Sequence, residues 1–236
     1  MNKYLSNIEL YYSSQLKNKN EIIISEADDF KHIVKVMRHS IDDEVYVTNG
    51  EGKIFKCKIF KINKDSLTTL NEETFEYDNT LSNIIFCIPK LKSHDRFEFA
   101  LEKCVELGIT SFIIFDSERT ISKGNKVERW NKILISAMKQ SLRSYLPKIS
   151  VLNSLEEINN LIGEKIVFEQ NSNQIFDNKN LERENKYYFI FGPEGGLSEK
   201  ELNQFNVNEK YKLASNRLRT ETAIIKCASL LNDFSI

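Results

Sequence analysis

The spacing of hydrophobic and polar residues changes along the chain and divides the sequence into two parts. In the first part, apolar residues alternate with polar ones over Val45–Val47, Ile54–Ile62 and Ser66–Phe75, the period of strands with one buried face. Glu21–Ile24 predicts a further strand, and Ala27–Met37 carries apolar residues three and four positions apart, which predicts a short helix. Several short strands with one helix predict a small half-open β-barrel.

From residue 83 onward, short apolar strands alternate with helices, which predicts a mainly parallel sheet covered on both faces. We expect a first domain over residues 1–75, a linker over 76–82 and a second domain over 83–236, with a loop at Gln170–Asn185. The predicted strands are Asn83–Ile88, Ser111–Phe115, Ile149–Leu152, Lys165–Phe168, Tyr187–Phe191 and Tyr211–Leu213, and the predicted helices are Phe97–Leu107, Glu128–Leu142, Leu155–Ile162, Glu199–Phe205 and Thr220–Phe234.

Composition indicates a folded chain and excludes several classes of protein. Of the 236 residues, 41% are hydrophobic and 28% are charged, with 3 prolines and 8 glycines, so collagen-like and wholly disordered chains are excluded. No apolar run approaches the roughly 18 residues of a membrane span, and no signal-peptide core is present, so we expect a cytoplasmic protein without membrane contact. The cysteines lack CxxC spacing, which predicts buried thiols and no metal site; they are Cys57, Cys87, Cys104 and Cys227.

The net charge is only −1, but basic residues gather locally. Between Arg119 and Lys148, eight basic residues occur with one acid, Glu128, and a second group over Lys31–His39 contains no acid. Either run is typical of a solvated helix face or of a surface that binds RNA. Lysines outnumber arginines 25 to 8, so single arginines indicate positions that need a planar, bidentate group. The arginines that we follow are Arg38, Arg96, Arg119, Arg143 and Arg219.

A glycine-rich segment follows the strand predicted at Tyr187–Phe191, whereas GxGxxG, GxxxxGK[ST], HExxH and GxSxG are all absent from the sequence. Gly195 and Gly196 allow positive φ and close backbone approach, and Ser198 with Glu201 predicts a capping box. Ligands of open α/β sheets bind at the carboxyl ends of strands, where this segment lies. The alternative is a tight turn without a ligand.

The second unusual segment is Asn216–Ala223, at the start of the last predicted helix. Its hydroxyls and its carboxylate suit a helix N-terminus, so the segment could simply be a well-capped helix. Arg219 does not fit that interpretation, because a cation at a helix N-terminus opposes the helix dipole. We therefore expect either a salt bridge from Arg219 to Glu194 or Glu221, or an anionic ligand.

Taken together, several segments resemble the ribosomal RNA small-subunit methyltransferase E family, which belongs to the SPOUT class, over nearly the whole chain. They are His32–Arg38, Glu102–Gly108, Ser117–Arg119, Trp130 with Ala137–Arg143, Gly192–Gly196 and Leu218–Ala223. The resemblance implies methyl transfer from S-adenosylmethionine to N3 of a uridine in 16S ribosomal RNA of the small subunit. It also implies an α/β trefoil-knotted SPOUT domain preceded by a small PUA-like β-barrel, and a homodimer. Met37 and Asp42–Asp43 depart mildly from the family pattern.

On this basis we assign residue roles as expectations. Arg219 stabilises negative charge on the uracil oxygens, and Glu194 holds Arg219 or assists removal of the N3 proton. The residues expected to bind the cofactor are Phe168, Glu169, Gly192, Pro193, Gly195, Gly196, Leu213, Leu218, Thr220, Thr222 and Ala223, and those expected to bind RNA are Lys35, Arg38, Arg119 and Arg143. His94 and Asp95 precede a helix and are read as capping residues. Two other functions stay open: a 2′-O-ribose methyltransferase of similar architecture, and a non-catalytic ribosomal RNA-binding assembly factor.

Overall fold

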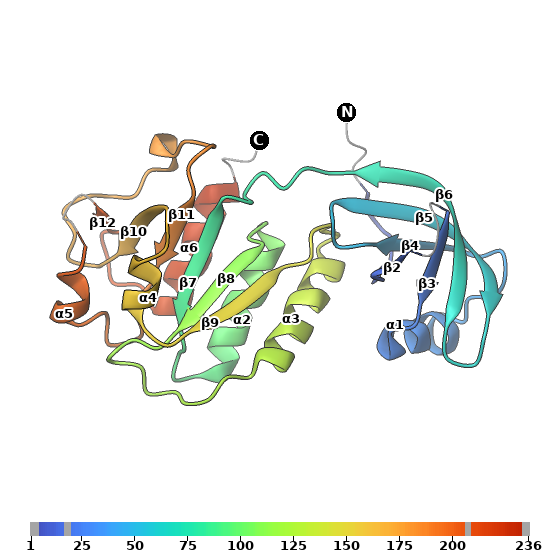
Figure 1. Ribbon diagram of the computed structural model, residues 1–236, viewed down its shortest axis with the longest axis horizontal. Coiled ribbons are helices and arrows are strands. Elements are labelled where there is room, and N and C mark those ends of the chain that lie inside the picture. The colour runs from blue at the N-terminus through green and yellow to red at the C-terminus, as the bar shows by residue number, and fades with distance from the viewer. Residues whose placement is uncertain (1–4, 17–19, 206–208, 233–236) are drawn as a thin grey trace. The chain divides into compact units, whose positions relative to one another are not determined.

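The computed structural model describes residues 5–16, 20–205 and 209–232. The chain forms two compact units (Figure 1): one comprises residues 1–79 together with 135–146, and the other comprises residues 80–134 together with 147–236. Each unit has its own six-stranded sheet. The first domain was expected to end at residue 75, and the first segment of the first unit ends at residue 79. The hydrophobic pattern did not indicate that residues 135–146 belong to the first unit.

The first unit contains a curled, mostly antiparallel sheet in the order β1-β4-β5-β6-β3-β2, in which β1 and β4 alone are parallel among the described strands. The pairing of β5 with β6 shifts register twice, at Lys56/Cys57 and at Ile59/Lys61, and such irregularities increase twist and bend a sheet. The predicted alternation is confirmed, since Phe55, Cys57 and Ile59 are buried in one core cluster. Ile54 is buried as well, in a second cluster with Leu10 and Phe75. The strands are β1 (Leu10–Tyr12), β2 (Gln15–Leu16), β3 (Glu21–Ile24), β4 (Glu44–Thr48), β5 (Lys53–Ile62) and β6 (Leu67–Glu76).

The predicted helix of the first unit is split. It consists of α1 (Ala27–Lys31) followed by a π-helical turn, η1 (His32–Val36). Phe30 and Ile33 are buried as predicted, but Met37 is 44% exposed, because the wider π turn shifts the residues after it away from the buried face. Asp29 is buried instead, accepting a hydrogen bond from the Tyr12 amide at 3.1 Å and pairing with Lys139.

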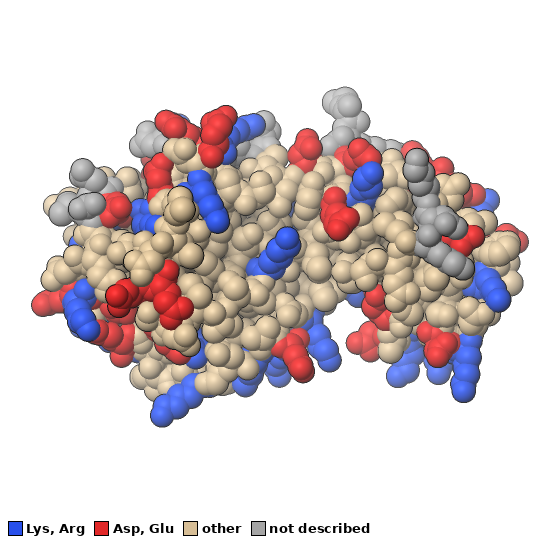
Figure 2. Space-filling view, in the orientation of Figure 1, with Lys and Arg blue, Asp and Glu red and all other residues tan. Residues whose placement is uncertain are grey.

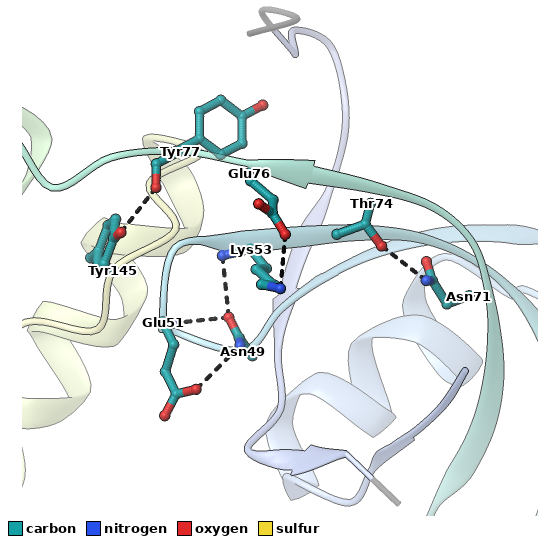
Figure 3. Close-up of polar contacts among 8 residues, drawn as sticks. All are labelled: Asn49, Glu51, Lys53, Asn71, Thr74, Glu76, Tyr77 and Tyr145. Atoms are coloured by element: carbon teal, nitrogen blue, oxygen red, sulfur yellow. Dashed lines mark hydrogen bonds and ion pairs between the residues drawn. The ribbon is translucent and has the colours of Figure 1, made fainter. Parts of the chain in front are cut away.

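Residues 135–146 join the first unit through hydrogen bonds with the predicted Asn49–Gly52 turn and with Tyr77. The amide of Gly52 donates to Ser144 O at 2.9 Å, and the Tyr145 hydroxyl donates to Tyr77 O at 2.9 Å (Figure 3). Gly52 has a φ of +93°, and a Cβ at this position would lie 2.5 Å from the Tyr145 hydroxyl oxygen. Only glycine therefore fits here. Figure 3 also shows the Asn49 side chain accepting hydrogen bonds from the amides of Glu51 and Lys53, which closes the turn.

The second unit is built on a fully parallel sheet in the order β12-β10-β11-β7-β8-β9, as the strand–helix alternation predicts. All six residues of β7 are buried, as expected for a central strand covered on both faces. The strands are β7 (Ile84–Pro89), β8 (Ser111–Phe115), β9 (Lys148–Leu152), β10 (Glu164–Phe168), β11 (Tyr187–Ile190) and β12 (Lys210–Tyr211).

Helices complete the second unit, and their ends differ in places from the sequence prediction. Leu155 and Ile158 of α4 pack on one face of the sheet with Ile85 and Cys87 of β7, while α2 and α6 contact each other. The predicted helices Leu155–Ile162 and Glu199–Phe205 end earlier, and residues 233–234 lie outside the described range. The helices are α2 (His94–Glu106), α3 (Val127–Gln140, which runs from the second unit into the first), α4 (Leu155–Asn159), η2 (Asn178–Asn180), α5 (Glu199–Leu202) and α6 (Thr220–Asn232).

The expectation of buried thiols is confirmed, because all four cysteines are free and buried. Burial raises the pKa of the Cys57 thiol to about 11, so this thiol is protonated and unreactive at neutral pH. Ser93, rather than His94 or Asp95, is the N-cap of α2, and its hydroxyl accepts a hydrogen bond from the Arg96 amide.

Candidate functional site

A cavity of about 810 Å³ opens at the carboxyl ends of β10 and β11, entirely within the second unit. Three loops supply most of its wall: the loop after β10, the glycine-rich loop after β11, and the segment that leads into α6. The lining residues are Arg96, Arg119, Phe168, Glu169, Gln170, Asn171, Phe191, residues 192–197, Leu202, Lys212, Leu213, Ala214, residues 217–221 and Ala223. The cavity therefore lies where open α/β sheets bind ligands.

The cavity brings together most of the residues that the sequence singled out. Both expected catalytic residues, Arg219 and Glu194, line it, as do all the expected cofactor-binding residues except Thr222, which is exposed on α6. Of the expected RNA-binding residues, Arg119 lines the cavity, whereas Lys35, Arg38 and Arg143 belong to the first unit. Sequence reasoning missed the lining residues Arg217, Lys212 and Asn171, and it followed Arg96 without assigning it a role.

The backbone of the glycine-rich loop shapes the cavity wall. The amide of Gly196 donates to Pro193 O at 2.8 Å, and Gly196 has a φ of +70°. Of the two glycines that allow positive φ, Gly196 adopts it and Gly195 does not. A Cβ on Gly192 would lie 3.0 Å from the Leu197 amide nitrogen, whereas one on Gly196 would meet no atom within 4 Å. Gly192 is thus required for close packing, and Gly196 for the backbone turn.

A buried carboxylate fastens this loop to the segment after β8. The predicted capping box is confirmed: the Ser198 hydroxyl accepts from the Glu201 amide at 3.1 Å, and the Ser198 amide donates to Glu201 Oε2 at 2.8 Å. Glu201 also accepts from the Ser117 hydroxyl at 3.1 Å and from the Glu118 amide at 3.0 Å. Next to these contacts, Arg119 Nη1 donates to Gly195 O at 2.7 Å. The sequence indicated only the capping half of this arrangement.

Glu194 and Arg219 do not pair, so the predicted salt bridge between them is wrong. Glu194 Oε1 instead accepts from the Lys92 amide at 2.9 Å, which joins the loop before α2 to the glycine-rich loop. Glu221 is buried, and its ion pair is with Arg96, with 3.6 Å between Nε and Oε1. Within the described part of the chain, no ion pair involves Arg219. The other expectation for Arg219, an anionic ligand, therefore remains.

Aromatic and aliphatic side chains line the inner part of the cavity. The rings of Phe168 and Phe191 stack with their centroids 4.9 Å apart and an interplanar angle of 22°. Leu197, Leu213 and Leu218 add aliphatic surface. Such a wall suits a flat, largely uncharged ring system, with backbone groups of the loops available for hydrogen bonds.

Part of the basic stretch between Arg119 and Lys148 is engaged within the protein. Arg129 makes two hydrogen bonds of 2.6 Å to Glu98, and Lys139 pairs with the buried Asp29. On the face shown in Figure 2, basic and acidic side chains are interspersed.

In the described residues, no three His, Cys, Asp or Glu side chains gather in a way that could hold a metal ion. Nor is any described helix long and apolar enough to cross a membrane.

Two family models match the chain, one in each part. The model described as an RNA methyltransferase domain matches residues 79–232, and the model described as an RNA methyltransferase PUA domain matches residues 24–69. Of the curated proteins, the chain is 27% identical to ribosomal RNA small subunit methyltransferase E of Bacillus subtilis, covering 87% of this chain and 88% of that protein. It is 28% identical to the protein of the same name from Aquifex aeolicus, covering 96% and 100%.

Solved structures show the same fold. Ribosomal RNA small subunit methyltransferase E of Neisseria gonorrhoeae, solved bound to S-adenosyl methionine, superposes with a TM-score of 0.81 at 24% identity, covering 97% of this chain and 98% of that one. A probable rRNA-methyltransferase from Porphyromonas gingivalis gives a TM-score of 0.83 at 24% identity, with the same coverage. The expected architecture, a SPOUT-type α/β domain after a PUA-like domain, is confirmed by these matches.

Proposed function

Since the chain belongs to the RNA methyltransferase family, we propose that it transfers a methyl group from S-adenosylmethionine to N3 of a uridine in 16S ribosomal RNA. The observation that carries this proposal is the likeness, over most of both chains, to relatives named ribosomal RNA small subunit methyltransferase E. The position and composition of the cavity support it independently.

The residues of the cavity fit S-adenosylmethionine. The partly exposed Phe168 ring, stacked on the buried Phe191, borders the cavity where an adenine ring would lie, and the open face of Gly196 lets a ligand approach the backbone. This cofactor carries no phosphate, which agrees with a glycine-rich loop in a sequence that lacks the GxxxxGK[ST] motif. When bound, the cofactor supplies an electrophilic methyl group on a sulfonium ion.

The chain's own residues hold and orient the reactants. Backbone groups of residues 192–196 and of Leu213 and Leu218 would hold the cofactor, and the leucine side chains would keep water from its apolar parts. Thr220 and Ala223 extend this wall at the start of α6. Thr222 lies outside the lining, so we leave it out of the proposed pocket.

Methylation at N3 requires the loss of the N3 proton, which leaves negative charge on the O2 and O4 atoms of uracil. Arg219 lines the cavity and makes no ion pair with the described residues, so its guanidinium is available to stabilise that charge. Glu194 does not hold Arg219. Its hydrogen bond with the Lys92 amide fixes the glycine-rich loop, and its proposed role is therefore to position this loop or to assist proton removal.

For RNA binding we propose the basic residues of the first unit. Lys35 lies in the π-helical turn and Arg38 follows it, and both are exposed; Arg38 has a φ of +57°, a strained conformation for a residue with a side chain. Arg143 is half-buried, and burial lowers its pKa from the ordinary value, though a guanidinium stays charged. The proposal also includes the small ribosomal subunit as the partner, a homodimer, a trefoil knot in the second domain and a cytoplasmic location.

Two observations weigh against a purely RNA-binding assembly factor. The first is the family match of the second unit, and the second is a cavity of suitable size beside the glycine-rich loop. To test activity, the protein would be incubated with S-adenosylmethionine labelled in its methyl group and with small ribosomal subunits from cells that lack this protein. We expect label in 16S RNA. If the protein binds subunits but transfers no label, it is an assembly factor.

A further inference from the structure

The arginines of this chain are concentrated at the cavity. Among the described residues, the lining includes four of the chain's eight arginines but one of its 25 lysines. A general need for positive charge would draw on the more abundant lysine. The choice of arginine instead indicates a ligand with a pair of adjacent anionic oxygens, such as the two non-bridging oxygens of a phosphodiester, to which a guanidinium donates two parallel hydrogen bonds.

Most of these guanidinium groups have donors that the protein does not use. Arg119 is engaged with Gly195 O. Arg96 approaches Glu221 only through Nε, at 3.6 Å, and its terminal nitrogens make no hydrogen bond or ion pair with the described residues. The side chains of Arg217 and Arg219 likewise have no hydrogen bond or ion pair within the described chain. All three residues line the same cavity, Arg96 from α2 and the other two from the segment that leads into α6.

The charges of the cavity do not balance with the cofactor alone. Four arginines and Lys212 line it with three carboxylates, those of Glu169, Glu194 and Glu221, which leaves a formal surplus of two positive charges. S-adenosylmethionine adds a sulfonium and an ammonium against one carboxylate, so it increases the surplus. Its single carboxylate can occupy one guanidinium at most. The surplus of positive charge therefore favours a further anion at this side of the cavity.

We infer that Arg96 and Arg217 bind the RNA phosphates on either side of the target nucleotide. This inference rests on the proposed function, which leaves Arg219 for the uracil oxygens. Arg96 is 47% exposed and Arg217 is exposed, so a polymer can reach both side chains from outside the cavity. The buried carboxylate of Glu221 keeps Arg96 at the cavity through its Nε and leaves the terminal nitrogens for the phosphate.

The experiment compares Arg96→Gln, Arg217→Gln and the double variant with a matched control, Arg129→Gln. Arg129 lies outside the cavity and is already paired with Glu98, so the control makes the same change in net charge elsewhere. Binding to unmethylated small subunits would be measured over a series of KCl concentrations. Affinity for S-adenosylhomocysteine, a probe of the cofactor pocket, would be measured by calorimetry.

We expect each cavity variant to reduce the slope of log K against log[KCl] by about 0.7, the value for one phosphate of single-stranded RNA. The double variant should lose about 1.4, while affinity for S-adenosylhomocysteine changes less than about twofold. Arg96→Lys and Arg217→Lys should keep the wild-type salt slope but not the full affinity at low salt. Lysine keeps the positive charge but lacks the planar guanidinium that donates two parallel hydrogen bonds. The control should keep the wild-type slope.

Two results would overturn the inference. A tenfold loss of S-adenosylhomocysteine affinity with an unchanged salt slope would assign these arginines to the carboxylate of the cofactor. An equal loss of slope in Arg129→Gln would show an effect of overall charge rather than of a site. Methyl transfer by the wild-type protein is measured alongside. If the wild type transfers no methyl group, the proposed function fails; if it does and either result above is found, only the inference about Arg96 and Arg217 fails.

Discussion

At the scale of single residues, the two adjacent glycines of the loop after β11 have different structural requirements. Gly196 has a positive φ and open space at its Cβ position, whereas Gly195 has ordinary φ and a Cβ there would lie 3.5 Å from Arg119 Cδ. A side chain at Gly196 therefore strains the backbone by about 1–2 kcal/mol, while one at Gly195 makes only ordinary contacts.

This difference predicts that Gly196→Val lowers affinity for S-adenosylmethionine at least tenfold, because the strained loop shifts and the added branch occupies the space open to a ligand. Gly195→Ala should bind within about threefold of wild type. Calorimetry on both variants, with circular dichroism to verify folding, is the measurement. Equal affinities in the two variants would contradict the assignment of the loop to the cofactor.

Arg219 allows binding and chemistry to be separated. If its guanidinium stabilises the uracil anion, Arg219→Lys should keep cofactor and RNA affinity near wild type and lower single-turnover rate by roughly 10²–10³-fold, the effect of a lost transition-state donor. Raising the pH should partly rescue this variant, since hydroxide increases the fraction of deprotonated uracil. A loss of cofactor affinity with an unchanged rate at saturation would make Arg219 a structural residue of the pocket.

At the scale of elements, α5 shows how a very short helix is kept in place. It has four residues, too few to be stable alone, and its Glu201 carboxylate accepts hydrogen bonds from Ser198, Ser117 and Glu118. The same carboxylate holds the segment that carries Arg119. Local helix propensity therefore contributes little here compared with one buried acceptor group.

Glu201→Gln removes one acceptor oxygen and adds a donor facing the Ser117 hydroxyl or the Glu118 amide. We expect a loss of about 1–3 kcal/mol in the free energy of unfolding, measured with urea, because a buried donor is left unsatisfied. The matched control is Glu199→Gln, an exposed residue in the first turn of the same helix, which should change stability by less than about 0.5 kcal/mol. Equal losses of unfolding free energy in the two variants would mean that the hydrogen bonds of Glu201 do not stabilise this part of the fold.

Elements were predictable where a periodic burial pattern decides them. The strands of the parallel sheet are short apolar runs, and β7 is buried at every position, so its existence follows from hydrophobicity alone. The π turn after α1 was not predictable, because it begins within an apparently regular 3.6-residue pattern. Helices α4 and α5 end before Leu161 and Phe205, which still pack in the core, so the apolar pattern does not mark where these helices stop.

At the scale of the whole molecule, the sequence motifs predicted where the cavity lies but not the hydrogen bonds and ion pairs of its lining residues. The segments Gly192–Gly196 and Leu218–Ala223 lie in adjacent loops, as expected of residues that act together. Arg96 comes from α2 and belongs to neither segment, so only the folded chain shows that it joins the site, whereas Arg217 directly precedes Leu218 but was given no role from sequence. The pairing of Glu221 with Arg96 rather than Arg219 depends on packing that no local pattern records.

The position of the transferred methyl group distinguishes methylation at N3 of uridine from methylation elsewhere on the nucleotide. Wild-type protein would be incubated with unmethylated small subunits and S-adenosylmethionine, and the 16S RNA would be digested to nucleosides and analysed by liquid chromatography and mass spectrometry against standards. We expect one new nucleoside, 3-methyluridine, formed by the wild type and reduced at least a hundredfold in rate by Arg219→Lys. A 2′-O-methylated nucleoside in its place would contradict the proposed methylation of N3.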